Sequence, residues 1–196
     1  KRVVLSEYRT QRRGGRGKSG MSTKETDFVE HLFVASTHST MLFFTTAGRV
    51  FSRKVFHLPL GSRIARGKPI VNVLPFEADE KLAMVLAVDE FKDGHFLFFS
   101  TAKGRVKKTN LMAYSNIRST GIIAINLNEG DELISVRQTT GESDVILATE
   151  SGMAIRFRED NVRSMGRDTA GVRGIDLQGD DKVVGCITFD RDETQG

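Results

Sequence analysis

Short apolar stretches rich in β-branched and aromatic residues alternate with glycine-containing polar turns along the whole chain. Three segments share one pattern, in which an apolar stretch, a turn and a second stretch follow one another: 42–50, 97–106 and 146–155, with turn glycines at 48, 104 and 152. This pattern is typical of a β-hairpin. Helical periodicity is scarce, so the sequence predicts an all-β fold.

Two further markers recur with the hairpins and define a repeat of about 50 residues. An apolar segment opens each unit, at Phe28–Ser36, Leu82–Val88, Leu133–Thr139 and Val183–Phe189. After each hairpin, a loop glycine precedes a short apolar triplet, at 71–73, 125–127 and 175–177. Four strands in a repeat of this length are typical of propeller blades, although the pattern alone also fits sandwich arrays and related closed folds.

The unit starts also predict the domain organisation. We expect one repeat-built domain over residues 1–196, divided into a partial first blade (1–27), three repeats (28–81, 82–132 and 133–182) and the start of another (183–196). The fragment would then hold about three complete blades plus partial ones. The start at Lys1, without Met or an apolar leader, favours a piece of a longer polypeptide.

A dense basic segment, which we call the box, lies in the partial first blade. It comprises Gln11, Arg12, Arg13, Gly14, Gly15, Arg16, Gly17 and Lys18. Guanidinium groups suit phosphate oxygens, and glycine lets the backbone approach a ligand closely. An ungapped alignment of Lys1 with Lys107 places Gly15 on Gly121. The later repeat continues from this glycine as an apolar strand, whereas the box continues with basic and polar residues. We interpret this divergence as a site that grips a polyanion, in preference to a solvated basic loop.

Equivalent loops in the other repeats also carry arginine. If the repeats radiate around a hub, these loops share one rim, and that geometry suits bent duplex DNA held through its phosphates. We expect the strongest contacts from the box and further contacts from Arg63, Arg66, Lys68, Arg105, Lys107, Lys108, Arg118, Arg163 and Arg167. Arg49, Arg156 and Arg158 lie on predicted strands, where we expect salt bridges.

Composition narrows the class of function. The chain is 39% hydrophobic and 28% charged with a net charge of +4, and its basic residues are dense in the first 20 positions. No apolar run suits a membrane helix, and the single Cys186 excludes a disulfide framework and favours the cytoplasm. The four histidines lack metal-ligand spacing, so we predict no metal and no cofactor in this fragment.

Candidate catalytic residues do not form a recognisable site. Tyr8 and Tyr114 occupy equivalent repeat positions, which favours packing or a structural hydrogen bond. Gly17-Lys18-Ser19 lacks the earlier glycine and the strand–loop–helix context of a P-loop. Phe43-Phe44 and Phe98-Phe99 are expected in the core and not as stacking platforms for bases. We predict no catalytic activity in the fragment.

Several of these motifs resemble one known family. Residues 11–17 are similar to the signature box of the DNA gyrase A protein, and the resemblance continues through 5–8, 47–50, 65–72, 104–109 and 169–175. It implies a propeller-like β-pinwheel whose neighbouring blades exchange strands, and a C-terminal domain that wraps double-stranded DNA. It further implies a parent type II topoisomerase that uses ATP and Mg²⁺ elsewhere, with the gyrase B protein and a second copy of the gyrase A protein, to introduce negative supercoils.

Two alternatives remain open. The first is the matching domain of topoisomerase IV, whose box is typically degenerate or missing; here the box is complete apart from Arg16 in place of lysine. The second is a propeller-like protein-interaction scaffold whose basic loops bind an acidic protein. Binding to duplex DNA at several salt concentrations separates a scaffold from a wrapping surface, which should show a slope of about −0.9 per phosphate contact.

Overall fold

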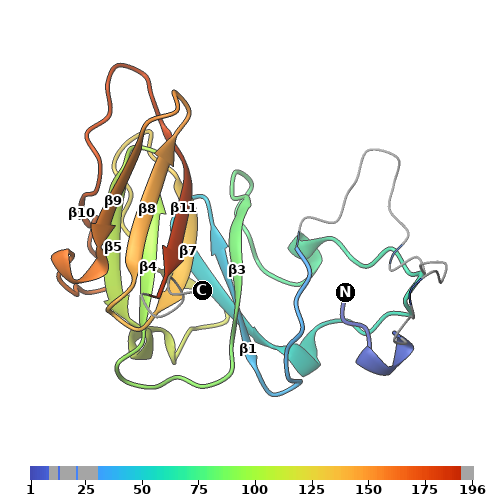
Figure 1. The fold of residues 1–196 in the computed structure, drawn as a ribbon. Coiled ribbons are helices and arrows are strands. Elements are labelled where there is room, and N and C mark those ends of the chain that lie inside the picture. The colour runs from blue at the N-terminus through green and yellow to red at the C-terminus, as the bar shows by residue number, and fades with distance from the viewer. Residues whose placement is uncertain (9–12, 14–20, 22–30, 191–196) are drawn as a thin grey trace.

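The computed structural model describes residues 1–8, 13, 21 and 31–190, and the strands of this part of the chain form three antiparallel sheets (Figure 1). The strands are β1 (Thr40–Thr45), β2 (Arg49–Lys54), β3 (Leu82–Val88), β4 (Phe96–Thr101), β5 (Arg105–Asn110), β6 (Ile122–Ile123), β7 (Leu133–Thr139), β8 (Asp144–Thr149), β9 (Ala154–Arg158), β10 (Val172–Arg173) and β11 (Val183–Phe189). The helical segments of the described part are short 3-10 turns: η1 (Leu5–Glu7), η2 (Val55–His57), η3 (Ile70–Asn72), η4 (Leu111–Tyr114) and η5 (Glu159–Asn161). None of these is long and apolar enough to cross a membrane.

Each sheet is built on one predicted hairpin. The strand orders are β3-β1-β2-β6, β10-β5-β4-β7 and β11-β8-β9. One edge strand of each sheet (β3, β7 or β11) is the segment that opens the next unit of the sequence, and its bounds agree with the predicted segments 82–88, 133–139 and 183–189. The all-β prediction and the hairpin predictions are therefore confirmed.

Neighbouring repeats exchange strands. The two-residue strand β6 belongs to the second repeat but pairs with β2 of the first sheet, and β10 pairs with β5 in the same way. Because the outer strand of a sheet comes from the following repeat, the fold is the propeller-like pinwheel that the resemblance implied. The connection that ends in β6 or β10 carries the loop arginines from one sheet to its neighbour.

Turn glycines make this exchange possible. Gly48 has a φ of 79°, which favours glycine, and its carbonyl accepts hydrogen bonds from the backbone amides of Ala124 (2.8 Å) and Ile125 (3.1 Å). A Cβ atom on Gly48 would lie 2.5 Å from the Ile125 carbonyl oxygen. The following repeat docks its apolar triplet directly against this turn, so a side chain there would push the repeats apart.

The core lies between the sheets. β3 contacts β7, and β7 contacts β11, so the unit-opening strands pack next to one another. Phe44 and Phe99 are fully buried, and their rings meet edge-to-face at 5.8 Å between centroids. Phe43 and Phe98 are also buried. The expectation that the phenylalanine pairs form core is confirmed.

Two strand predictions require correction. Within the predicted strand Phe28–Ser36, residues 31–36 form no strand, and 28–30 lie outside the described residues. The equivalent strand β7 pairs with hairpin strand β4 of the preceding repeat; no described residue occupies that place for 31–36. The apolar triplets are also not strands. Residues 71–73 overlap η3, and in the later repeats the short strands β6 and β10 end before the triplets begin.

Candidate nucleic-acid interface

Two of the predicted basic loops meet in one groove. Arg118 belongs to residues 115–121, which we call the Arg118 loop, and Arg167 belongs to residues 162–171, the Arg167 loop. These connections are equivalent in neighbouring repeats, and both arginines line a groove together with Arg49 and the isoleucines of β6. Arg118 is exposed and Arg167 is half-buried. The groove is therefore lined by two cationic side chains from successive repeats, together with the carboxylate of Asp168.

Arg49 has a structural role in this groove. Its Nη1 donates to the carboxylates of Glu77 (2.8 Å) and Glu80 (3.0 Å), and its Nη2 donates to the Thr120 carbonyl (2.7 Å). Glu80 is almost fully buried, so this pair is shielded from screening by salt. The predicted salt bridge is confirmed, and the hydrogen bond from the same guanidinium to Thr120 anchors the end of the Arg118 loop.

The other two strand arginines also pair with acids. Arg156 pairs with Asp144, and Arg158 pairs with Asp160 at 2.6 Å. These contacts agree with the expectation of salt bridges on strands. Their carboxylate partners reduce the positive potential of β9, in contrast to the exposed Arg118.

Arg105 occupies the position of Arg49 in the next repeat. Its Nε donates to the Ala170 carbonyl (2.9 Å) and its Nη2 to the Gly171 carbonyl (2.5 Å). The guanidinium thus binds the end of the Arg167 loop, as Arg49 binds the end of the Arg118 loop. A phosphate contact by Arg105 stays a prediction, but two of its donors already serve the protein.

The structure corrects the expected phosphate contacts of Lys107 and Lys108. The Lys107 side chain is fully buried, and its Nζ donates to the carbonyls of Ala124 (2.6 Å) and Arg167. Lys108 is 7% exposed, and its Nζ donates to the Glu159 carbonyl (3.1 Å). Consecutive residues of strand β5 point to opposite faces of its sheet, and both faces are covered by protein here, so neither lysine is accessible to DNA phosphates.

A sequence signal for this burial existed. Aligning the turn glycines places Lys107 on Phe51 and Ile155, so the position is apolar in the other repeats. Burial lowers the pKa of the Lys107 ammonium from 10.5 to about 7; the Asp168 carboxylate raises it, and Arg167 lowers it further. The ring of Phe99 lies 5.2 Å from Nζ and offers a partial substitute for water.

The first-repeat loop lies beside the start of the chain (Figure 1). Arg66 and Lys68 are exposed there. Arg63 is half-buried, its backbone amide donates to Glu7 Oε2 (2.9 Å), and its carbonyl accepts from Lys1 Nζ (2.5 Å). Arg163 in the later repeat is exposed as well. Phosphate contacts by these four basic residues stay predictions.

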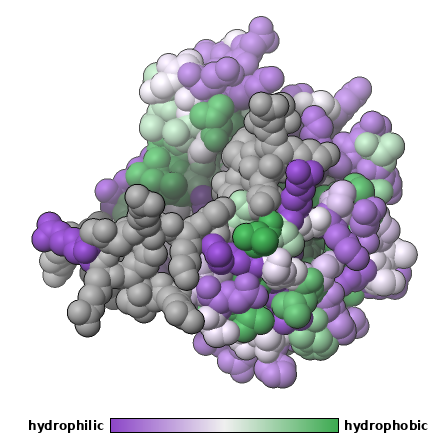
Figure 2. All heavy atoms as spheres, turned by 90° about the vertical axis from the view of Figure 1, so that its right-hand side faces the viewer, coloured by the Kyte–Doolittle hydropathy of each residue, from purple (hydrophilic) through white to green (hydrophobic). Residues whose placement is uncertain are grey.

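One box residue is described. Arg13 is exposed, and the remaining box residues lie outside the described residues: Gln11, Arg12, Gly14, Gly15, Arg16, Gly17 and Lys18. Figure 2 shows the face on this side of the molecule, where apolar patches lie among hydrophilic ones. Leu5, Leu60 and Ile64 are more than 60% exposed in this part of the chain. The described surface here is therefore mixed in polarity and not uniformly basic.

The two equivalent tyrosines differ. Tyr114 is buried and its hydroxyl donates to the Ala124 carbonyl (3.1 Å), and burial raises the pKa of this phenol. Its structural role is confirmed. Tyr8, in the partial first blade, is 44% exposed. Tyr114 thus supports the carbonyl that Lys107 also binds, at the end of the Arg118 loop.

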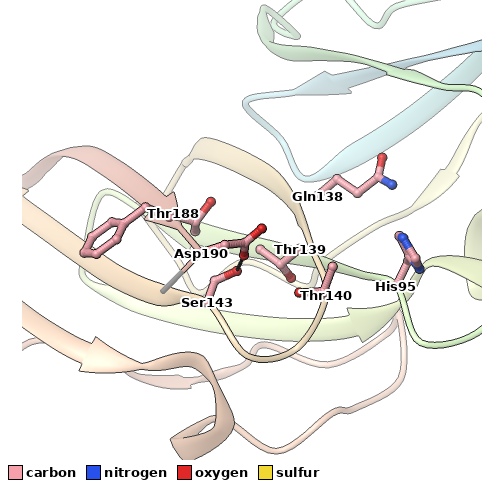
Figure 3. Close-up of a pocket in the computed structure, with 8 residues that line it drawn as sticks. His95, Gln138, Thr139, Thr140, Ser143, Thr188 and Asp190 are labelled. Carbon is pink, nitrogen blue, oxygen red and sulfur yellow. Dashed lines mark hydrogen bonds between the residues drawn. The ribbon is translucent and has the colours of Figure 1, made fainter. Parts of the chain in front are cut away.

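A second hollow has a different chemistry (Figure 3). It is lined by His95, Gln138, Ser143 and Asp190, among others, and none of its described lining residues is lysine or arginine. The Ser143 hydroxyl donates to Asp190 Oδ1 (2.8 Å), which adds a negative charge at this site. Such a surface does not suit a polyanion. Within the described ranges, no group of three or more His, Cys, Asp or Glu residues could hold a metal ion.

Comparisons with known proteins agree with the fold. A family model described as "DNA gyrase C-terminal domain, beta-propeller" matches residues 1–36, 39–89, 95–140 and 143–190. The chain is 54% identical over 183 residues to the DNA gyrase A protein of Salmonella typhimurium and 51% identical over 175 residues to that of Halalkalibacterium halodurans. These alignments cover 93% and 89% of the chain but 21% of each relative, so the chain spans about a fifth of their length.

Solved structures give the same result for the fold. The chain is similar to a crystal structure of the C-terminal domain of DNA topoisomerase IV, with a TM-score of 0.74 and 30% identity, over 79% of this chain and 48% of that one. It is also similar to a structure of a DNA gyrase A C-terminal domain, with a TM-score of 0.66 and 19% identity, over 94% and 59% of the two chains. The second likeness concerns the fold alone.

Proposed function

The chain belongs to the DNA gyrase C-terminal domain family, and from this premise we propose that it binds double-stranded DNA along its arginine-bearing loops. The duplex bends around the rim on which these loops lie, and the ATP-dependent holoenzyme then introduces negative supercoils. The gyrase B protein and a second copy of the gyrase A protein act through the rest of the polypeptide, in the cytoplasm. In this proposal ATP and Mg²⁺ act in other parts of that enzyme.

The observation that supports this proposal is the groove shared by Arg118 and Arg167. Their loops are equivalent in successive repeats, so the same type of contact recurs from one sheet to the next. DNA phosphates also recur at regular steps along a curved duplex. A series of equivalent arginines therefore favours contacts to the backbone of bent DNA, with little reading of base sequence.

The energetics of this mode require several contacts. Bending 20–30 base pairs by 40–90° costs on the order of 1–6 kcal/mol. Each phosphate neutralised by lysine or arginine releases condensed counterions, which favours binding at low salt. The exposed cations Arg66, Lys68, Arg118 and Arg163 supply such contacts in addition to those of the box. A binding surface of this kind loses affinity steeply as salt rises.

The test is a supercoiling assay on the intact enzyme. Replacing Arg12, Arg13 and Arg16 by alanine should abolish negative supercoiling of relaxed plasmid and leave ATP-independent relaxation intact. Arg173→Ala is the matched control, because this exposed arginine pairs with Asp176 at 3.3 Å. Supercoiling at the wild-type rate in the triple variant would show that the box has no part in wrapping.

A second candidate has a specific observation in its favour. The likeness to the topoisomerase IV domain, at 30% identity, favours a role in an enzyme that decatenates DNA. The same relaxed plasmid separates the two functions. Gyrase makes the plasmid negatively supercoiled in the presence of ATP, whereas topoisomerase IV leaves it relaxed and unlinks catenated circles. Net decatenation without supercoiling would favour the second candidate.

A further inference from the structure

Three cations on strand β5 bind backbone carbonyls that belong to the following repeat. The Nζ of Lys107 donates to the carbonyl of Arg167, in the Arg167 loop. Arg105 donates to two carbonyls at the end of the same loop, and Lys108 donates to a carbonyl in η5, just before it. All these acceptors are main-chain oxygens, so the strand holds the shape of the connection and leaves its side chains available.

Lys107 is the central member of this group. Besides the Arg167 carbonyl, its Nζ binds the carbonyl of Ala124 at 2.6 Å, which follows the Arg118 loop and β6. One ammonium therefore ties together the two connections that line the groove. The side chain is fully buried, and an ammonium with two carbonyl acceptors is a costly group to place there unless those contacts are needed.

The partial first blade (1–27) contains the same arrangement. The Nζ of Lys1 donates to the Arg63 carbonyl at 2.5 Å. It also donates to the carbonyls of Ser62 (2.9 Å) and Ala65 (2.6 Å). Lys1 aligns with Lys107 in the ungapped alignment of the repeats. A lysine thus binds the loop of the following repeat at two separate places in the molecule.

The acceptors are equivalent as well. Aligning loop glycines Gly67 and Gly171 places Arg63 on Arg167, so both lysines bind the carbonyl of the same loop arginine. The bridge between Arg2 and Leu60 likewise corresponds to the bridge between residues 108 and 164. This agreement in register shows that the same contact, from a lysine ammonium to the carbonyl of a loop arginine, occurs at two equivalent places in the chain.

The repeat 28–81 supports the loop of the following repeat by a different contact. Phe51 occupies the lysine position there, and its ring lies beneath Gly121 at the end of the Arg118 loop. A Cβ on Gly121 would lie 2.7 Å from the nearest ring atom. The Arg118 loop therefore rests on an apolar surface and lacks a lysine at this position, whereas the other two loops are bound through the carbonyl of their arginine.

On the basis of the proposed function, we propose that Lys107 is a positioning residue of the DNA interface. Its ammonium fixes the carbonyl of Arg167 and thereby holds the guanidinium of that residue at the groove; Lys1 does the same for Arg63. Lys107 itself does not touch DNA. The charged groups that act on it are Asp168 and Arg167, and the Tyr114 hydroxyl shares its acceptor, the Ala124 carbonyl.

The first test needs no DNA. Hydrogen exchange of the loop amides is compared among three full-length proteins: the wild type, Lys107→Met and the control Lys92→Met. The control removes an exposed ammonium. Amides of the Arg167 loop should exchange roughly tenfold faster or more in Lys107→Met, as expected when a charge-assisted hydrogen bond is lost. They should be unchanged in the control. An unchanged loop in folded Lys107→Met would overturn the proposal.

The second test uses the salt dependence of binding to a linear DNA duplex. Arg167→Ala removes one phosphate contact and should reduce the log–log slope by about 0.9. Lys107→Met should cause the same reduction, and the double variant should show no further change, because both substitutions remove one contact. A reduction of about 1.8 in the double variant would mean that Lys107 contacts DNA directly, against the proposal.

The exposed Lys1 keeps the test valid if Lys107→Met fails to fold. Lys1→Met should loosen the loop around Arg63 and should be non-additive with Arg63→Ala, whereas its effect should add to that of Arg167→Ala. Additivity with Arg63→Ala would refute the positioning role. Failure of the wild-type protein to bind duplex DNA would refute the proposed function alone, because the exchange result in the absence of DNA would still decide whether the lysine fixes the loop.

Discussion

The buried ammonium of Lys107 should make stability depend on pH in a way that one substitution removes. Its pKa is about 7 in the folded protein and 10.5 when exposed. Between these values the unfolded chain binds a proton that the folded protein has released. The penalty of burying the charge is therefore fully present below about pH 7 and is relieved as pH rises toward 10.5. Stability should increase over this range.

The size of the effect follows from the two pKa values. Each pH unit in the middle of the interval adds about 1.4 kcal/mol when one full proton distinguishes the two states. The proton is half released in the folded protein at about pH 7. The free energy of unfolding therefore rises by roughly 2 kcal/mol between about pH 7 and about pH 9. Lys107→Met has no ionisable group at this position and should lack the gain.

Urea unfolding at a series of pH values measures this difference directly. The other titrating groups are present in both proteins and cancel in the comparison. The control Lys92→Met should follow the wild-type curve, because that ammonium is exposed. Wild-type and Lys107→Met curves that run parallel from neutral to alkaline pH would show that the Lys107 ammonium is not desolvated as its burial indicates.

Three further predictions test the fold. Gly121→Ala should destabilise the protein by clearly more than Gly152→Ala, as measured by thermal unfolding. Both residues have positive φ, but a Cβ at 121 would lie 2.7 Å from the Phe51 ring, whereas none of the described atoms lies within 4 Å of a Cβ at 152. Phe99→Ala should cost roughly 3–5 kcal/mol in denaturant unfolding, because the ring is fully buried. Tyr114→Phe should cost about 1 kcal/mol by the same measurement, through loss of one hydrogen bond.

Much of the fold could be predicted because its signals are local. The openers Leu82–Val88, Leu133–Thr139 and Val183–Phe189 are strands with those bounds, since apolar segments between polar turns leave little choice of structure. The opener at Phe28–Ser36 is also largely apolar, but residues 31–36 form no strand. A strand needs a partner, and composition does not reveal whether one is present.

The candidate site was harder to predict, because lysine is usually exposed. Lys107 and Lys108 were expected on the rim on account of their charge, although the aligned residue Phe51 marks a core position. Arg118 and Arg167 could be paired from repeat equivalence, and the structure places them in one groove. The backbone carbonyls that bind Lys107 could not be predicted, because every residue carries such a group and sequence does not distinguish among them.

The exchange of strands between repeats has a mechanical consequence. The Arg118 loop leaves one sheet after η4 and ends in β6, which is hydrogen-bonded to β2 of another sheet. A force applied to the middle of this loop is therefore divided between two sheets and does not peel a single hairpin from its neighbour. A polymer under tension on this surface would pull on several blades together, and the strain at any one hydrogen-bond ladder would be correspondingly smaller.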